Sequence, residues 1–402
     1  MLNPSSKDFE FDIKRFTYPI DFNKRWARDI RQVVHEQEDE VRKFAEYLLP
    51  REDENLRDIE VFGTAKGRSR VVWQYTSESL RDLGYERTYD VFDELTPNPA
   101  RTNEIRSNVY VISGSGKTPP VNNYIKGLKQ GRKKEFNKRG IEVPTLVITS
   151  EYQSDLLDLL DKNDARIITT PKETINKNEG QKHPGEYMYS EAELKALIVS
   201  TLGKYFLDNP YSFDPKKFAD PTYTLENWFE NVRDKVIQQN ENVEKLTDYF
   251  LPLKGKKPKI IILGNKDTKS GMVERYAAIR LINAGFDVYH TNRFEPLIKS
   301  DGDNCVLYTL VGNEEVKDPC YVDLNKLEKY HEDIPVVVAS SSNKSPLTEF
   351  ATEMVVLPNK TANPDESYLK LLTFSELVES YLAMRLGLTE DDIKRGHKKI
   401  EV

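Results

Sequence analysis

The chain has 402 residues, of which 38% are apolar and 31% charged, a balance typical of a globular protein with about two or three domains. Its net charge of -7 is spread over both signs without a long basic block, which argues against a nucleic-acid-binding surface. No apolar run approaches the roughly 18 residues of a membrane-spanning helix, and the first residues have neither the basic nor the apolar part of a secretion signal, so we expect a cytoplasmic protein that binds no membrane.

The first part of the chain predicts an arm and a helix, followed by a parallel sheet. Residues up to about Pro50 carry apolar side chains at helical spacing. From Ile59 onward, short apolar strands alternate with helical stretches, which is the pattern of a parallel sheet with crossover helices. The predicted strands are Ile59–Phe62, Arg87–Phe92, Asn108–Ile112, Thr145–Thr149 and Arg166–Ile168. Ligands gather at the carboxyl ends of such strands, so we expect the loops that follow them to form one crevice.

The third predicted strand ends in small hydroxyl and glycine residues, in the stretch Ser113-Gly-Ser-Gly-Lys-Thr118. Ser113, Ser115 and Thr118 carry hydroxyl groups, and Gly114 and Gly116 allow the backbone to approach a ligand closely. A helix beginning near Thr118 would direct its free N–H groups toward an anion. This stretch therefore predicts a phosphate site, and a serine-glycine turn without a ligand is the alternative.

Two families end a strand in nearly these letters. The nucleotide-binding P-loop would require a glycine at Val111, inside the predicted strand, and this argues against a nucleotide kinase. The stretch instead resembles the Ser-x-Ser-Gly-x-Thr pattern of the sugar isomerase (SIS) domain. The resemblance implies a flavodoxin-like α/β sandwich of three layers, in which a five-stranded parallel sheet is flanked by helices.

Two further loops of this first unit resemble those of SIS domains. Gly63-Thr-Ala-Lys-Gly-Arg-Ser69 resembles the first SIS loop, and Thr149-Ser150 followed by Ser154 resembles the Thr-x-x-x-x-Ser pattern after the fourth strand. The resemblance implies substrate contacts from Thr64, Ser69, Thr149 and Ser150. Lys66 and Arg68 would add positive charge there, although exposed loop cations are the commoner explanation.

The chain then leads into a second unit. Residues 170–186 are polar and predict a surface loop, a helix resumes at Glu191, and Tyr211–Tyr223 predicts a linker before a helix over Leu225–Phe250. The strands predicted beyond it are Lys259–Leu263, Asp287–His290, Asn304–Leu310, Pro335–Ala339 and Met354–Leu357. The sequence has two cysteines; Cys305 lies in one of these strands, so a buried free thiol is expected rather than a disulfide bond or a metal site.

The second unit repeats the first. Gly264 lies 201 residues after Gly63 (264 − 63), and Val336 lies 190 after Leu146 (336 − 146), as expected if one order of elements recurs with shorter connections. The resemblance extends over 59–388 and implies two tandem SIS domains, as in the isomerase part of glucosamine-6-phosphate synthase. The predicted organisation is an N-terminal arm and helix over 1–57, a first SIS domain over 58–210, a second with a leading helix over 211–388, and a C-terminal tail over 389–402.

The two copies differ in chemistry. After its third strand the second copy reads Thr309-Leu-Val-Gly-Asn-Glu-Glu315, in which the serines are absent and two carboxylates are added. Because carboxylates repel a phosphate, we expect one phosphate site per chain, in the first copy. The alternative is that neither copy binds phosphate.

Interconversion of an aldose and a ketose needs a base that moves a proton between neighbouring carbons. In the tandem family the catalytic glutamate follows the second strand of the second copy, which implies Glu295 as the base. The family's Gly-Glu-Leu-Lys-His-Gly-Pro block is absent from this segment, and Glu94 in the first copy is the competing candidate. Glu274, near the start of a predicted helix, is expected to do no more than favour the helix dipole.

Ring opening calls for a histidine, whose pKa lies near neutrality. His290 closes a predicted strand shortly before Glu295. His397 is the second candidate, because the C-terminal tail resembles the His-x-x-x-Glu ending of hexulose-6-phosphate isomerase. A lone histidine is more often structural or solvated.

Two functions remain open from the sequence. The first is a phosphosugar aldose–ketose isomerase, or a variant that removes an amine from an amino-sugar phosphate, acting through an enediol without metal or cofactor. The second is a non-catalytic SIS protein that binds a sugar phosphate in regulation, although no helix-turn-helix segment or basic arm is visible. The resemblance implies a homodimer or homotetramer in either case.

Overall fold

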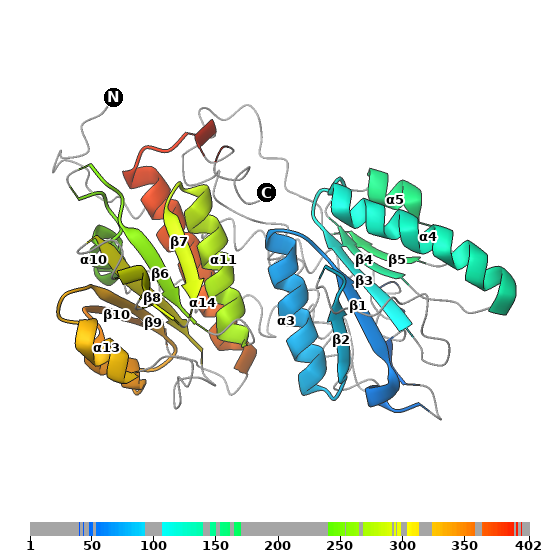
Figure 1. The fold of residues 1–402 in the computed structure, drawn as a ribbon, viewed down its shortest axis with the longest axis horizontal. Helices are drawn as coiled ribbons and strands as arrows, with labels where there is room; N and C mark the ends of the chain where they lie inside the picture. The colour runs from blue at the N-terminus through cyan, green and yellow to red at the C-terminus, as the bar shows by residue number, and fades with distance from the viewer. Residues whose placement is uncertain are drawn as a thin grey trace, which may run out of the picture. The chain divides into compact units, whose positions relative to one another are not determined.

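The computed structural model describes residues 40, 43, 48–50, 54–92, 107–139, 145–149, 153–160, 165–169, 240–253, 255–264, 268–291, 293–294, 296–298, 304–312, 324–357, 364–389, 391–392 and 395. They form two compact units, one before residue 170 and one from residue 240 onward, each with its own sheet (Figure 1). The predicted polar loop, the helix from Glu191 and the linker Tyr211–Tyr223 lie outside these residues, as does most of the N-terminal arm.

The first sheet has five strands, and all neighbouring strands are parallel. Its strands are β1 (Glu60–Thr64), β2 (Arg87–Asp90), β3 (Ser107–Ser113), β4 (Thr145–Thr149) and β5 (Ala165–Thr169). They lie in the order β2-β1-β3-β4-β5. The chain adds β2 on one side of β1 and β3, β4 and β5 on the other, so the switch point of the topology lies between β1 and β3. In sheets of this kind that switch point is where ligands bind.

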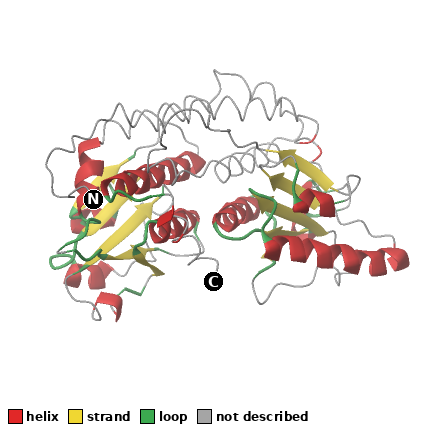
Figure 2. Cartoon of the chain, turned by 90° about the horizontal axis from the view of Figure 1, so that it is seen from above, coloured by secondary structure: helices red, strands yellow, loops and turns green. Residues whose placement is uncertain are grey.

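Helices cover both faces of the first sheet (Figure 2). A short 3-10 helix, η1 (Leu56–Asp58), precedes β1, and α3 (Arg68–Asp82) places Trp73 against Tyr110 of β3, with ring centroids 5.4 Å apart. Successive side chains of a strand point to opposite faces. On the other face, α4 (Pro119–Arg139) and α5 (Asp155–Leu159) pack against the alternate strand residues. The buried members of this cluster are Phe62, Val109, Val111, Val121, Ile125, Leu128, Val147 and Leu156.

The second sheet repeats the first in strand number, direction and order. Its strands are β6 (Lys259–Leu263), β7 (Asp287–Thr291), β8 (Cys305–Val311), β9 (Val336–Ser340) and β10 (Glu353–Val356). They lie in the order β7-β6-β8-β9-β10, with every pair of neighbours parallel. The predicted α/β class, with two five-stranded parallel sheets, is therefore confirmed, and each predicted strand lies within two residues of the observed bounds.

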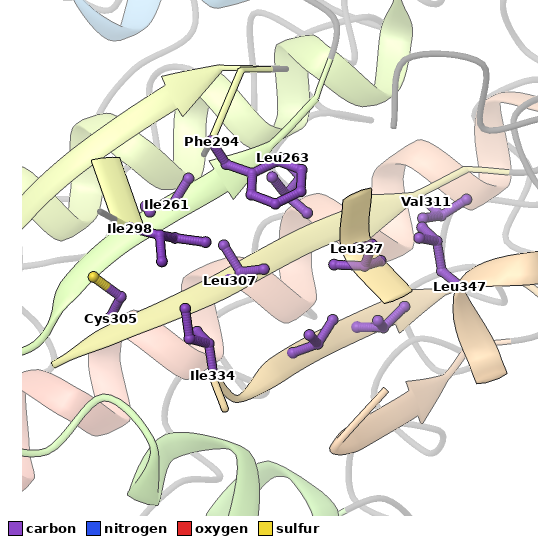
Figure 3. Packing of buried hydrophobic residues seen from close by; sticks show 12 residues of the cluster. Ile261, Leu263, Phe294, Ile298, Cys305, Leu307, Val311, Leu327, Ile334 and Leu347 are labelled. Atoms are coloured by element: carbon purple, nitrogen blue, oxygen red, sulfur yellow. The ribbon is translucent and has the colours of Figure 1, made fainter. Parts of the chain in front are cut away.

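The second unit also has three layers. On one face, α11 (Lys269–Asn283) contacts β6, β7, β8 and α14 (Pro364–Arg385), and α10 (Asn240–Asp248) contacts β10 and α14. The other face is covered by α13 (Leu324–Tyr330), the 3-10 helix η2 (Pro346–Phe350) and Phe294 and Ile298, which meet the strand residues in one apolar cluster (Figure 3). Cys305 belongs to this cluster and is a buried free thiol, as predicted. Among the helices that the structure describes, none combines the length and apolar character needed to cross a membrane.

Candidate functional site

The loop between β3 and α4, Ser113–Thr118, is the predicted phosphate site and is called the anion loop below. Its backbone turns through a hydrogen bond that the Gly116 N–H donates to the Ser113 carbonyl oxygen, at 3.3 Å. The Lys117 N–H donates to Ser115 Oγ, also at 3.3 Å. Gly114, Ser115 and Thr118 are half-buried and Lys117 is exposed. Because its tip is open, a bound anion has access to this loop.

The conformation and packing of Gly116, in the anion loop, leave no room for a side chain. Its φ is +62°, which side chains of L-residues rarely tolerate, and an added Cβ would lie 2.2 Å from Ser154 Oγ. Its carbonyl oxygen accepts from the Leu156 N–H at 3.0 Å and from Asn122 Nδ2 at 3.2 Å. The glycine thus allows the loop to pack against the segment after β4, where Ser154 precedes α5.

Thr64 Oγ1, Ser113 Oγ and Ser154 Oγ are buried hydroxyl groups in this region that have no hydrogen-bond partner among the residues that the structure describes. They stand at or just beyond the carboxyl ends of three neighbouring strands, β1, β3 and β4. Ser154 is the N-cap residue of α5, yet its hydroxyl does not cap that helix. An unpaired buried hydroxyl costs about 1–3 kcal/mol, and such groups in a native protein need an explanation. An anion with several acceptor oxygens would satisfy them.

The start of α4 corrects one expectation. The helix begins with Pro119 and Pro120, so its first two positions carry no N–H group. The Asn122 N–H is also engaged, because it donates to the Thr118 carbonyl oxygen at 3.0 Å. The predicted row of free N–H groups at the helix start is therefore largely missing, whereas the hydroxyls of Ser113, Ser115 and Thr118 remain as possible donors.

The other predicted contact residues are distributed as follows. Ser69 is buried in the first turn of α3, Thr149 is buried at the end of β4, and Ser150 lies outside the described residues. Lys66 is exposed, with Nζ 4.3 Å from the ring centroid of Phe92, which favours a surface role. Of Arg68 the structure gives only its place at the start of α3.

In the second unit, Gly312 directly after β8 is closely packed, and residues 313–323 that follow it lie outside the described residues. An added Cβ at Gly312, directly after β8, would lie 2.3 Å from the Tyr368 ring of α14. The Gly312 N–H donates to Ser270 Oγ at 2.8 Å. Glu314 and Glu315 lie outside the described residues.

Of the predicted catalytic residues, the structure describes only His290. Glu295, His397 and Glu94 lie outside the described residues. The His290 side chain on β7 is 8% exposed, and its Nε2 lies 3.3 Å from Oε2 of Glu274 on α11.

Glu274 is the residue whose role the sequence did not reveal. It is fully buried, and its Oε1 accepts hydrogen bonds from Thr309 Oγ1 at 3.1 Å and from the Leu310 N–H at 3.3 Å. Burial raises the pKa of Glu274, although the contacts with His290, Leu310 and Thr309 oppose this rise. The expectation that Glu274 only favours the helix dipole is therefore wrong. The available signal was a carboxylate among Met272, Val273, Tyr276 and Ala277, all of them buried.

The strand order and the anion loop are the features of this chain that can be compared with known proteins. Two parallel sheets have the strand order 2-1-3-4-5, and the first carries Ser-x-Ser-Gly-x-Thr after its third strand. No protein-family model and no curated protein sequence matches the chain.

Two solved structures share this architecture. Tagatose-6-phosphate ketose/aldose isomerase from Escherichia coli is 15% identical, with a TM-score of 0.62 over 94% of this chain and 94% of that chain. The C-terminal domain of glucosamine-fructose-6-phosphate aminotransferase from Francisella tularensis is 17% identical, with a TM-score of 0.54 over 89% of this chain and 96% of that chain. At these identities the likeness shows a common fold.

Proposed function

We propose that the protein binds a phosphorylated sugar and interconverts its aldose and ketose forms. The observation that carries this proposal is the set of three unpaired buried hydroxyls, Thr64, Ser113 and Ser154, beside a half-exposed serine-glycine loop. Phosphate is an acceptor-rich anion and matches these donors. The solved structures of similar fold include a ketose/aldose isomerase of a sugar phosphate, which supports the same substrate class.

The chemistry divides between positioning and proton transfer. The anion loop holds the phosphate, and a base moves a proton between the first two carbons of the open sugar through an enediol. We assign the base to Glu295, with Glu94 as the competing residue, and ring opening to His290, with His397 as the second candidate. Removal of an amine from an amino-sugar phosphate would use the same proton transfer. We also propose that the protein forms a homodimer or homotetramer and acts in the cytoplasm.

A non-catalytic sugar-phosphate sensor is the second candidate. The segment from Tyr289 to Lys299 lacks the family's Gly-Glu-Leu-Lys-His-Gly-Pro block, and this is the observation that favours it. The test is incubation with a panel of ketohexose and aldohexose 6-phosphates in deuterated water. Incorporation of deuterium at C2 supports the isomerase, and saturable binding without exchange supports the sensor.

The anion loop itself is tested by Ser113→Ala. Because the Ser113 hydroxyl is buried and unpaired, its removal should leave the unfolding free energy unchanged or raise it, while phosphosugar affinity falls by about 1–3 kcal/mol. Calorimetric titration and urea unfolding measure the two quantities. Ser115→Ala with Thr118→Ala should weaken binding in the same way.

The matched control is Ser77→Ala, in the same unit. Ser77 Oγ donates to Thr88 Oγ1 at 2.8 Å, so this substitution removes a buried hydrogen bond and should cost about 1 kcal/mol of stability without affecting binding. Equal affinity in wild-type protein and the Ser113→Ala variant would contradict the assigned phosphate site.

A further inference from the structure

The proposed phosphate site of the first unit offers neutral donors but little positive charge. Its buried hydroxyls, those of Thr64, Ser113 and Ser154, are uncharged, and the two prolines that begin α4 remove N–H groups that would carry partial positive charge. Asp155, which directly follows Ser154, is acidic and exposed. A phosphate monoester carries a charge of about -1.5 to -2 at neutral pH, so these groups alone leave most of it uncompensated.

Lys117 is the cation of the anion loop itself. Its side chain is exposed, and among the residues that the structure describes its ammonium group forms no ion pair and no hydrogen bond. Two other cations near these strand ends are engaged. Arg70 Nε lies 2.6 Å from Asp90 Oδ2, and Lys66 Nζ lies 4.3 Å from the ring centroid of Phe92. Of these three cations, Lys117 is the one whose charge has no partner in the described part of the chain.

The backbone on both sides of Lys117 is held by one residue, Asn122 of α4. Asn122 Nδ2 donates to the Gly116 carbonyl oxygen at 3.2 Å, and the Asn122 N–H donates to the Thr118 carbonyl oxygen at 3.0 Å. Because a carbonyl oxygen only accepts, the first of these bonds also fixes the orientation of the Asn122 amide. The Lys117 side chain therefore leaves the loop from a well-defined point.

Ser115 places Lys117 close to a bound anion. The Lys117 N–H donates to Ser115 Oγ at 3.3 Å. A hydroxyl oxygen that accepts a hydrogen bond can still donate its own proton, so Ser115 can at the same time donate to an anion. Such an anion lies only one hydroxyl group away from the Lys117 backbone. The flexible four-carbon stem of a lysine can bring its ammonium group to a ligand at that distance.

We infer that Lys117 is a specificity-determining residue of the proposed phosphate site, which selects a doubly charged sugar phosphate over a singly charged ester of the same shape. This inference rests on the proposed function. Neutral hydroxyls donate equally to the tetrahedral oxygens of a phosphate or a sulfate ester. The second negative charge distinguishes the two esters, and a lysine ammonium group responds to that charge.

The test compares hexose 6-phosphates with the matching hexose 6-sulfates by calorimetric titration of the full chain. At about pH 8 the phosphate is doubly charged, because its second pKa is about 6, and the sulfate is singly charged. Wild-type protein should bind the phosphate about 5- to 30-fold more tightly than the sulfate. Lys117→Met should remove most of this preference, and Lys117→Arg should keep it. Ser113→Ala should weaken binding of both esters and leave the preference unchanged.

Salt separates the charge of Lys117 from the hydroxyl contacts. Raising the salt concentration from about 0.01 M to about 1 M shortens the screening length from about 30 Å to about 3 Å. The preference for the phosphate should therefore shrink with salt in wild-type protein and change little in Lys117→Met. Lys126→Met is the matched control. Lys126 is exposed on α4, its replacement changes the net charge by the same amount, and the preference should remain as in wild-type protein.

The outcomes distinguish this inference from the proposed function. An equal preference in wild-type protein and Lys117→Met overturns the inference, while binding of the hexose 6-phosphate leaves the proposed function standing. A loss as large in Lys66→Met or Lys126→Met also overturns it, because the general surface charge then explains the preference. A loss confined to Lys117→Met and absent from Lys117→Arg supports it. If wild-type protein binds no hexose 6-phosphate at all, the proposed function fails and the inference fails with it.

Discussion

Gly116 shows how a single backbone position holds the anion loop in shape. Gly116→Ala would place a side chain at a φ of +62° and within 2.2 Å of Ser154 Oγ. We expect the free energy of unfolding to fall by about 1–3 kcal/mol, because the backbone is strained and Ser154 must move. Phosphosugar affinity should fall as well. Urea unfolding and calorimetric titration measure the two effects.

The control for this substitution is Gly127→Ala in α4. Nothing lies within 4 Å of an added Cβ there, and Gly127 is exposed within the helix. Alanine should therefore stabilise the protein by about 0.5–1 kcal/mol and leave binding unchanged. If both variants behave alike, the packing of Gly116 on Ser154 has no special role.

The raised pKa of Glu274 makes a prediction about pH. Because burial raises the pKa of this carboxyl above its ordinary value of 4.5, the folded state holds the proton more tightly than the unfolded state. The stability that Glu274 contributes is fully present at or below that value and is lost as the pH rises above it. The difference in unfolding free energy between wild-type protein and Glu274→Gln should therefore shrink as the pH increases, as measured by urea unfolding across the acidic and neutral range.

Asp392 provides a control of opposite sign. Hydrogen bonds from Thr389 lower the pKa of Asp392 below its ordinary value of 3.8, so its contribution is lost only as the pH falls below that value. Asp392→Asn should thus leave the pH dependence above 4.5 unchanged. A flat difference between wild-type protein and Glu274→Gln would show that the carboxyl of Glu274 titrates normally.

At the scale of elements, α11 and α14 are joined by a buried ion pair. Arg280 Nε lies 3.1 Å from Glu379 Oε2, both side chains are 1% exposed, and Ser375 Oγ donates to Glu379 Oε1 at 2.8 Å. Glu379→Leu should cost about 3–5 kcal/mol of unfolding free energy, because it leaves a buried cation without its carboxylate. Arg280→Met combined with Glu379→Leu should recover most of that loss. A double-mutant cycle by urea unfolding checks this, and additive losses would contradict it.

The elements were predictable from the sequence where the signal is local. Apolar runs such as Thr145–Thr149 and Lys259–Leu263 became β4 and β6 with the same bounds. The end of β3 was equally predictable, because Ser113 marks the change from apolar to small polar residues. Glu274 was not predictable in this way, since its burial depends on how α11 lies over β6, β7 and β8. Pro119 and Pro120 are plain in the sequence. That they remove the N–H groups at the start of α4 became clear only once the structure showed that the helix begins at Pro119.

At the scale of the whole molecule, the two units share a strand order but differ in the residues that follow their third strands. Directly after β8, Gly312 packs against Tyr368 and Ser270, whereas the loop after β3 carries the serines of the proposed phosphate site and has a half-exposed tip. We therefore expect one phosphosugar per chain at saturation, measured by equilibrium dialysis with a radiolabelled hexose 6-phosphate. Two molecules per chain would show that the second unit binds this ligand as well.

The repeated order of elements could be recognised from the sequence because matching positions lie 201 and then 190 residues apart, and the two sheets confirm the order it predicts. The difference between the units could be predicted only in part from the sequence. The absence of serines after β8 can be read from the sequence, but the packing of Tyr368 against Gly312 depends on α14, which follows β8 by more than 50 residues.

The two prolines at the start of α4 also bear on how the protein can change over generations. An anion held by main-chain N–H groups survives most point mutations, because every residue except proline supplies such a group. An anion held by hydroxyl side chains is lost when single codons change, and the layers beneath remain intact. If the proposed phosphate site is correct, a few substitutions of its hydroxyl residues would abolish binding and leave the sheet of the first unit intact.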